Sequence, residues 1–393
     1  MLADPDIWPD QQPTPSDWRC RWRLFRNRLL ANSEFQRWAA KTPLVRRIAS
    51  KKAVELHHLT AGFVYTQTLT AVVQSNLLAV LHGRIESTKS VAAMCGLTPR
   101  AAHTLLTAAQ ALKLTEEVSR GFWMVGELGA SVLGNPGVAD MVRHHAVLYR
   151  DLADPLAVLK HRDSTGLRDY WSYVPGGNNP DEGHREYSQL MSSSLALISD
   201  HILDTVSFND YQSLIDVAGG TGFFARMVTK RHPHIAVSVL DLPEVVSEAK
   251  NQRANSDIRF VATDMFRSPL PQDVELFSLI RVLHDHDDDP INGLLIRLCS
   301  ALKPGGHLLI AEPMAGTPGA EPIGDTYFSF YLWAMGSGRP RTVEELTAMC
   351  LAAGFSAVRE FKTPIPALTR LLIAEKSSVA ASKTAKKRAV FNI

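Results

Sequence analysis

The sequence has few of the features that mark secreted, membrane-spanning or nucleic-acid-binding proteins. Its 393 residues include only four cysteines, and the spacing of Cys20, Cys95, Cys299 and Cys350 provides neither a C-x-x-C metal pair nor a disulfide framework. Scattered thiols suit a reducing compartment. The sequence has no apolar run long enough to cross a bilayer and no apolar signal core in its first residues. The formal net charge of +2 does not by itself indicate a nucleic-acid partner. We therefore expect an intracellular, cytoplasmic protein that is soluble or peripheral on a membrane.

The composition is that of a large globular protein. Apolar residues make up 45% of the chain and charged residues 21%, which is enough apolar material for a packed core. The length favours two domains. We expect a flexible lead with a basic amphipathic segment (1–52), a helical domain (53–205), an α/β domain (206–376) and a basic, disordered tail (377–393).

The segment between Asp17 and Lys52 is strongly basic. It carries eleven lysines and arginines against Asp17 and Glu34. Apolar side chains recur in it at helical spacing, namely Trp18, Trp22, Phe25 and Leu29. Two interpretations remain open: a solvated helix that packs on the rest of the protein, or an amphipathic helix that attaches to an anionic membrane surface.

Residues 87–125 show the pattern of a winged helix, with two short helices joined at Gly96-Leu97 and a hairpin from Glu117 to Val125. A regulator that binds DNA through this unit is the non-enzyme alternative. The candidate recognition helix, 98–112, carries only Arg100 and His103 to contact phosphates, whereas DNA affinity requires several neutralised phosphates. The pattern therefore favours a dimerisation or substrate-binding domain and no nucleic-acid partner.

From about Leu214 short β-rich runs alternate with helical segments. This alternation predicts a mainly parallel sheet with helices on both faces. The last two runs follow each other across a Pro-Ile-Pro break and predict an antiparallel hairpin at the sheet edge. The expected strands are SLIDVA, AVSVLDL, IRFVA, VELFSLI, HLLIAE (from His307), AVREFKT and RLLIAE.

A glycine-rich turn follows the first of these strands. Glycines allow the backbone to approach a ligand closely, and an acidic residue after the next strand, Asp241, can accept hydrogen bonds from ribose hydroxyls. Ala225 stands where the dinucleotide fingerprint has its third glycine, although an NAD site would share the turn and the acid. The turn spans Asp216, Gly219, Gly220 and Gly222.

Motifs further along the chain distinguish an NAD site from another kind of cofactor site. The motifs DVAGGTG (216–222), DLP (241–243), TDMF (263–266), LHD (283–285) and KPGG (303–306) resemble those of class I O-methyltransferases related to the plant caffeate and acetylserotonin enzymes. The resemblance begins near Ala53. It implies an α/β, Rossmann-like seven-stranded methyltransferase domain after an all-helical, winged-helix-like dimerisation domain, with S-adenosyl-L-methionine as cofactor and a homodimer. The cofactor-binding residues it implies are Asp216, Gly219, Gly220, Gly222, Asp241, Leu242, Asp264, Met265 and Arg281.

Four further stretches, FQRWAAKTPLVRRIA, AGFVYTQ, EPMAG and DTYFSFYLWAMGSGRPRT, are similar to bacterial hydroxyneurosporene or demethylspheroidene O-methyltransferases. That resemblance implies methylation of a tertiary hydroxyl of acyclic 1-hydroxycarotenoids, at the photosynthetic membrane. The alternative is another hydrophobic ring substrate, such as a bacteriochlorophyllide, an aromatic polyketide or a phenol.

His284 matches the catalytic histidine of the family, and Glu312 is expected to orient it. His286 is the alternative base. In the plant enzymes a second glutamate lies in the segment that reads Arg339-Pro340-Arg341 here. The two-glutamate arrangement of those enzymes is therefore not expected in this chain. The acidic run after His284 is expected to be a solvated helix start and not a metal site, because consecutive side chains point in different directions.

A long polyene needs a deep apolar tunnel. Aromatic and methionine side chains could line it, with ordinary core packing as the alternative for each. The candidate substrate-binding residues are Tyr187, Met191, Tyr327, Phe328, Tyr331 and Met335.

Overall fold

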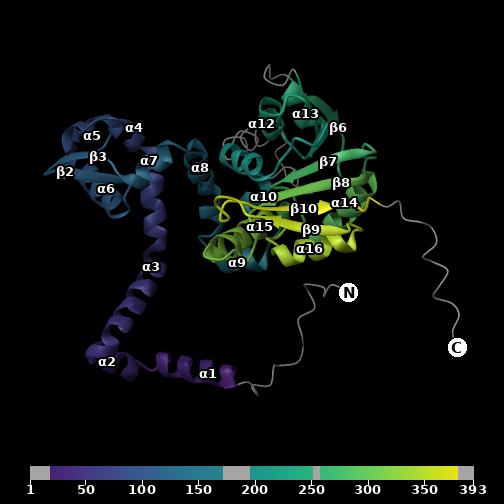
Figure 1. Cartoon of the computed structure of the whole chain (residues 1–393). Coiled ribbons are helices and arrows are strands. Elements are labelled where there is room, and N and C mark those ends of the chain that lie inside the picture. Colours follow the sequence, from purple (N-terminus) through teal and green to yellow (C-terminus); the bar gives the residue numbers. More distant parts are fainter. Residues whose placement is uncertain (1–17, 171–194, 251–256, 379–393) are drawn as a thin grey trace. The chain divides into compact units, whose positions relative to one another are not determined.

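The computed structural model describes residues 18–170, 195–250 and 257–378. The expected lead, most of the tail, and the candidates Tyr187 and Met191 lie outside the described residues. The chain divides into two compact units, Met1–Gly134 and Asn135–Ile393 (Figure 1). The domain boundary predicted from the sequence lies later, between the helical domain that ends at residue 205 and the α/β domain that begins at residue 206. That boundary stays a prediction, and the helices after Gly134 belong to the second compact unit.

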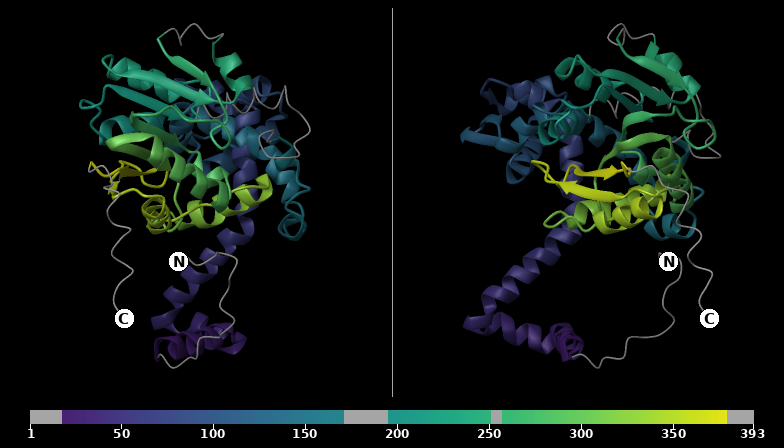
Figure 2. Two further views of the ribbon diagram at one scale, coloured as in Figure 1. Left: turned by 90° about the vertical axis from the view of Figure 1, so that its right-hand side faces the viewer. Right: turned by 45° about the vertical axis from the view of Figure 1, so that its right-hand side comes forward.

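The first unit contains a long helix with a small α/β body after it. Helices α1 and α2 lie at the far end of α3 from that body (Figure 2). Its elements are α1 (Trp18–Ala31), α2 (Ser33–Lys41), α3 (Pro43–Gln74), α4 (Leu77–Leu81), β1 (Glu86–Ser87), α5 (Thr88–Met94), α6 (Pro99–Ala111), β2 (Thr115–Ser119), β3 (Phe122–Val125) and α7 (Glu127–Leu133).

The helix pair and hairpin expected from the sequence are both present. Ser87 and Thr98 cap α5 and α6 by accepting backbone N–H bonds from Ser90 and Ala101. Gly96 lies between them at φ +66°, a conformation that glycine adopts without strain. The strands pair in the order β1-β3-β2. The indole of Trp123 is buried in the core of this unit and donates to the Thr88 hydroxyl at 3.0 Å.

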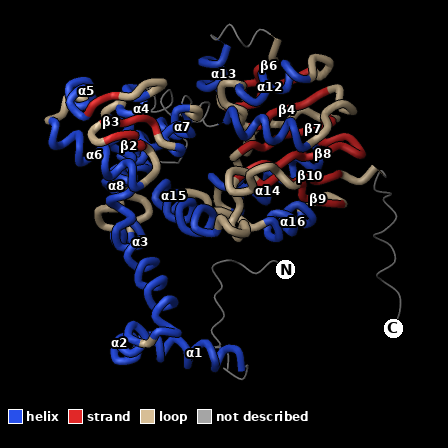
Figure 3. The backbone as a smooth tube through the Cα atoms, turned by 60° about the vertical axis from the view of Figure 1, so that its left-hand side comes forward, coloured by secondary structure: helices blue, strands red, loops and turns tan. Residues whose placement is uncertain are grey.

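The second unit begins with helices α8 (Pro136–Asp151), α9 (Pro155–Lys160) and α10 (Gly166–Tyr170). Its sheet and the helices around it follow (Figure 3). They are β4 (Ser213–Val217), α12 (Phe223–Arg231), β5 (Ala236–Asp241), α13 (Pro243–Lys250), β6 (Arg259–Ala262), β7 (Val274–Ile280), η2 (Leu283–Asp285), α14 (Asp288–Ala301), β8 (Leu302–Glu312), η3 (Pro322–Phe328), α15 (Ser329–Met335), α16 (Val343–Ala352), β9 (Ala357–Phe361) and β10 (Arg370–Glu375).

Seven strands form one mixed sheet in the order β6-β5-β4-β7-β8-β10-β9. The strands from β6 to β8 are parallel, and β10 runs antiparallel to both β8 and β9. The expected hairpin at the sheet edge is therefore confirmed. The expected start of one strand at His307 was wrong, because β8 begins at Leu302 and the Lys-Pro-Gly-Gly stretch forms an irregularity within it.

Alternating side chains divide the core between the two faces of this sheet. Ile215 and Val217 pack on the face covered by α14 and α16. Leu214, the residue before Ile215, packs with Phe224 and Val228 of α12 on the other face. This period of two is what a strand buried on both sides requires. The carboxyl ends of the parallel strands remain uncovered by either helical layer and provide the edge where ligands bind in such sheets.

No helix within the described ranges combines the length and the apolar content that spanning a bilayer requires.

Candidate cofactor and active site

A cavity of about 640 Å³ lies at the carboxyl ends of β4, β5, β6 and β7. Its lining comes from the turns that follow these strands and from the end of α15. Eight of the nine predicted cofactor residues line it, together with a predicted substrate residue, Met335. The eight are Asp216, Gly219, Gly220, Asp241, Leu242, Asp264, Met265 and Arg281.

The glycine-rich turn after β4 allows the backbone to reach the cavity. Gly220 has φ +57°, and a Cβ added there would meet no atom within 4 Å, so this glycine faces open space. At Gly219 a Cβ would collide with the Asp216 carboxylate. Gly222 does not line the cavity. It has φ +82° and forms the N-terminal boundary of α12, so its role in this turn is conformational.

Two carboxylates lie behind this turn, Asp216 buried and Asp241 half-buried. Asp216 accepts the Ser278 hydroxyl at 2.6 Å, and burial raises its pKa to about 7. Asp241 accepts the backbone N–H groups of Gly220 and Leu242, each at 2.7 Å. Burial raises the pKa of Asp241 to about 6, although these two hydrogen bonds lower it. A cationic ligand would favour the ionised form of both acids.

The opposite wall of the cavity is partly apolar. Met265 and Phe266 follow β6, and the Phe266 ring contacts the His286 ring edge-on at 4.8 Å between centroids. Asp264 lies two residues beyond the end of β6 and accepts the Phe266 backbone N–H at 2.8 Å. A flat ring with a hydrogen-bond donor at its edge would pack against Met265 and Phe266 and donate to the Asp264 carboxylate. Arg281 completes the edge at φ +58°.

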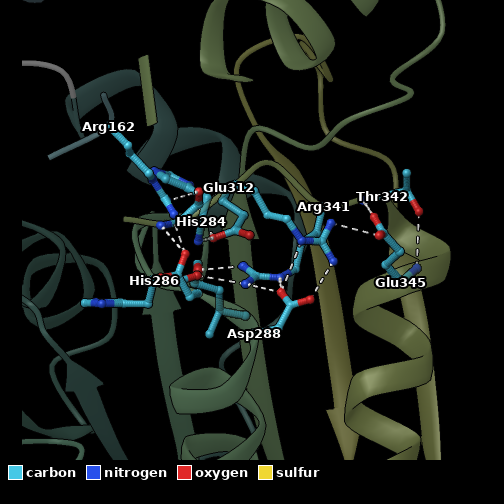
Figure 4. Close-up of polar contacts among 12 residues, drawn as sticks. Arg162, His284, His286, Asp288, Glu312, Arg341, Thr342 and Glu345 are labelled. Atoms are coloured by element: carbon cyan, nitrogen blue, oxygen red, sulfur yellow. Dashed lines mark hydrogen bonds and ion pairs between the residues drawn. The ribbon is translucent and has the colours of Figure 1, made fainter. Parts of the chain in front are cut away.

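His284 lies beside the cavity and is buried between two carboxylates (Figure 4). Its Nε2 is 3.1 Å from Asp285 Oδ1, and its Nδ1 is 3.4 Å from Glu312 Oε2. The His284 backbone N–H donates to the same Oε2 at 3.2 Å. Burial alone would lower the pKa of His284, but Asp285 and Glu312 outweigh it and raise the pKa to about 9. The ring therefore carries a proton at neutral pH in this arrangement.

The predicted pairing of His284 with Glu312 is therefore present in the geometry. His286 differs, because it lines the cavity and burial lowers its pKa, which favours the neutral ring. Among the described residues, no group of three or more histidine, cysteine or acidic side chains is arranged to hold a metal ion.

Arg341 holds the loop that carries His284, a role that the sequence did not reveal. Its buried guanidinium donates to the carbonyls of Leu283 and His286 at 2.7 and 2.8 Å and to Asp288 at 2.6 Å (Figure 4). Arg339 also donates to Asp288. Burial alone would raise the pKa of Asp288, but the two arginines outweigh it and hold the pKa below its ordinary value.

The prediction of a solvated acidic run was therefore wrong at Asp288, which an ion-pair network encloses. The prediction of a helix start was right, because Asp288 is the first residue of α14.

Gly338, just before these arginines in sequence, also holds the loop that carries His284, through its backbone. Gly338 has φ +80° and donates its N–H to Asp287 at 3.0 Å. Arg162 donates to Asp287 and to the Gly338 carbonyl, both at 3.2 Å. A Cβ at Gly338 would collide with the His284 carbonyl oxygen. The segment at 338–341 therefore fixes the backbone on either side of His284.

The predicted substrate residues that the structure describes lie together around η3 and α15. Phe328 faces the His284 ring, with 5.8 Å between centroids. Tyr327 and Tyr331 do not present purely apolar surfaces, because their hydroxyls lie 2.8 Å from Nε2 of His145 and His144 respectively. Burial raises the pKa of Tyr327 to about 12, so its hydroxyl is neutral at physiological pH.

The sheet order, the glycine turn after β4 and the cavity at the carboxyl edge together define a Rossmann-like methyltransferase. The O-methyltransferase domain family matches residues 149–356. Demethylspheroidene O-methyltransferase of Rhodobacter capsulatus is 39% identical over 86% of this chain and 85% of its own length. The enzyme of the same name from Cereibacter sphaeroides is 38% identical over 85% of this chain and 90% of its own. The chain therefore belongs to the O-methyltransferase family and is an S-adenosylmethionine-dependent O-methyltransferase.

Solved structures agree on the fold. Human N-acetylserotonin methyltransferase in complex with S-adenosylmethionine superposes with a TM-score of 0.69 at 22% identity, covering 83% of this chain and 98% of that one. CalO1, a methyltransferase of calicheamicin biosynthesis, gives 0.70 at 19% identity over 83% and 98%. The cavity of this chain fits the cofactor, because carboxylates such as Asp216, Asp241 and Asp264 suit a sulfonium cation and ribose hydroxyls, and an apolar wall beside them suits the adenine.

Proposed function

We propose that this enzyme methylates a tertiary hydroxyl of acyclic 1-hydroxycarotenoids. The observation that carries the proposal is the 39% identity, over most of both chains, to an enzyme named for demethylspheroidene. The aromatic side chains of η3 and α15 beside His284 support it, because they provide apolar surface next to the polar groups of the site. A polyene needs such surface along its length.

For the cofactor, we assign Asp241 to the ribose hydroxyls and Asp264 with Met265 to the adenine. Gly219, Gly220 and Leu242 present backbone to it, and Gly222 sets the turn. Asp216 and Arg281 lie at the same edge and complete the polar lining. Bound there, S-adenosylmethionine supplies a methyl group already activated on sulfonium.

The protein must then align the substrate oxygen, exclude water and accept one proton. Alignment is the larger contribution, since well-oriented reactants save roughly 7–11 kcal/mol. We assign the proton to His284, with Glu312 positioning its ring. This assignment requires His284 to be neutral, so the pairing with Asp285 and Glu312 must loosen, or the pH must approach 9, before the ring accepts a proton. A tertiary alcohol is a weak acid, so its proton leaves late, as the new C–O bond forms.

We also propose a homodimer that works in the cytoplasm and meets its substrate at the membrane through residues 18–52. Because a carotenoid is almost insoluble in water, the substrate proposal predicts that the enzyme needs this membrane contact to reach its substrate.

Incubating the purified enzyme with labelled S-adenosylmethionine and matched hydroxycarotenoids, phenols and chlorins tests the substrate class. We expect the highest kcat/KM on an acyclic 1-hydroxycarotenoid and no turnover of the same carotenoid without the hydroxyl. A higher kcat/KM on a phenol or a chlorin would reject the proposal in favour of a hydrophobic ring substrate.

A further inference from the structure

Helix α1 exposes a narrow aromatic stripe that no described residue of the first unit covers. None of its fourteen residues is buried. Trp18, Trp22 and Phe25 are 71%, 57% and 56% exposed, and Leu29 is 36% exposed. Because successive residues of an α-helix are about 100° apart, these four side chains fall within an arc of roughly 60°. An exposed stripe of this kind indicates a surface that meets an apolar partner.

The charges of α1 are arranged around that stripe. The helix contains no acidic residue and five arginines. By the same helical geometry, Arg21 and Arg28 flank the stripe on one side, and Arg19 and Arg26 flank it on the other. The Arg19 guanidinium lies over the Trp18 ring at 5.7 Å. Guanidinium groups beside aromatic rings can reach outward while the rings point down.

We propose that α1 binds an anionic lipid surface, with Trp18, Trp22, Phe25 and Leu29 inserted at the interface and the flanking arginines on lipid phosphates. Aromatic and aliphatic side chains on one face with basic residues at its borders are what an interfacial helix requires. A second copy of this chain fits the stripe less well, because two α1 helices would bring ten arginines together without an acidic residue. The proposal narrows the membrane-binding region from residues 18–52 to one face of α1.

Helix α2 differs from α1, although its Trp38 is also 53% exposed. In α2, Glu34 occupies the first turn, Ala39 is buried and Phe35 is half-buried. Its apolar face is therefore partly occupied inside the first unit, whereas that of α1 is free. This contrast assigns the lipid contact to α1 and leaves α2 to join α1 to α3.

Co-sedimentation of the full-length protein with vesicles tests this proposal without any substrate, so its outcome is separate from that of the proposed function. We expect binding to phosphatidylcholine vesicles that contain phosphatidylglycerol, little binding to phosphatidylcholine alone, and loss of binding as salt is raised. Replacing Arg21 and Arg26 with glutamine should weaken binding about thirty-fold, because each basic residue near the surface contributes roughly a fivefold factor.

A matched pair of double variants tests the stripe itself. Trp22→Ala with Phe25→Ala removes aromatic residues of the stripe, whereas Leu24→Ala with Leu30→Ala removes side chains that are 50% and 47% exposed but lie outside it. We expect about a tenfold or greater loss for the first pair and less than about twofold for the second. Unchanged activity on detergent-dispersed substrate would show that each variant is folded.

Three results would overturn the proposal. Binding could be equal to neutral and anionic vesicles at low salt, or equally weakened in both double variants. Alternatively, the protein could fail to bind anionic vesicles while the Trp22→Ala, Phe25→Ala variant loses a dimer that the wild type forms, which would assign the stripe to a second copy of the chain.

Discussion

Replacing Arg341 with methionine should destabilise the fold and reduce catalysis, although Arg341 is expected to contact neither cofactor nor substrate. Its side chain is fully buried and donates four hydrogen bonds, to Leu283, to His286 and twice to Asp288. Methionine has similar bulk and no donor, so two carbonyls and a carboxylate would lose these partners. Breaking a buried charged pair costs about 3–5 kcal/mol.

Arg339 moderates that cost, because it also donates to both oxygens of Asp288. We therefore expect the lower end of the range, about 3 kcal/mol. Replacing Arg339 with methionine is the control. Its side chain is 32% exposed and Asp288 would keep Arg341, so we expect a loss of about 1 kcal/mol or less.

Denaturant unfolding of the two variants, followed by kcat for the folded enzymes, measures both effects. Arg341→Met should lower kcat about a hundredfold, because a small displacement of His284 misaligns the site, while affinity for S-adenosylhomocysteine changes little. Equal losses of stability in the two variants, or a loss below about 1 kcal/mol for Arg341→Met, would refute the role given to this side chain.

Three further predictions concern the titration of the base, the cofactor site and the loop backbone. The raised pKa of His284, about 9 in the folded chain, means that its pairing stabilises the protein fully below its ordinary pKa and that this contribution is lost as pH rises through 9. The single-turnover rate should therefore increase toward pH 9, and Glu312→Gln should move that rise to lower pH, whereas a pH-independent rate in the wild type would contradict the assignment. Asp241→Ala removes the acceptor of two backbone N–H groups and should weaken S-adenosylhomocysteine binding roughly ten- to a hundredfold, and calorimetry showing unchanged affinity would sink the assignment. Gly338→Ala should cost about 3 kcal/mol or prevent folding, from the collision with the His284 carbonyl and the strained φ. Gly293→Ala, in open space within α14, should be neutral or slightly stabilising in the same unfolding assay.

The sheet was predictable because each of its strands ends at a turn that the sequence marks. The run before Asp216 leads into three glycines, and the runs around Asp241 and Asp264 end at polar residues followed by Pro243 and by Ser268-Pro269. The parallel edge then follows from strand alternation, which brings these carboxyl ends to one side. The beginning of β8 at Leu302 was missed because Pro304 and two glycines interrupt the local pattern, although Leu302 still pairs with Val274 of β7 before the register shifts.

The contacts that support His284 were not predictable from local pattern. Arg341 and Asp288 are 53 residues apart in sequence, and nothing in either neighbourhood shows that the guanidinium is buried. Charged residues are rarely fully buried unless paired, so a run of acids suggests solvent until its partner is located. The contacts of Tyr327 and Tyr331 with histidines were equally unpredictable, because α8 provides both histidines from more than 180 residues away in sequence.

The central claim is O-methylation of an aliphatic hydroxyl, and the position of the transferred methyl carbon tests it most directly. S-adenosylmethionine carrying a ¹³C-labelled methyl should be incubated with an acyclic 1-hydroxycarotenoid, with Asp241→Ala enzyme as the matched control. We predict one labelled methyl ether on the tertiary oxygen from the wild type, and much less from the variant when the cofactor concentration is too low to saturate the variant. Label on a ring or chain carbon, or no label in the carotenoid while a phenol is methylated, would contradict the account.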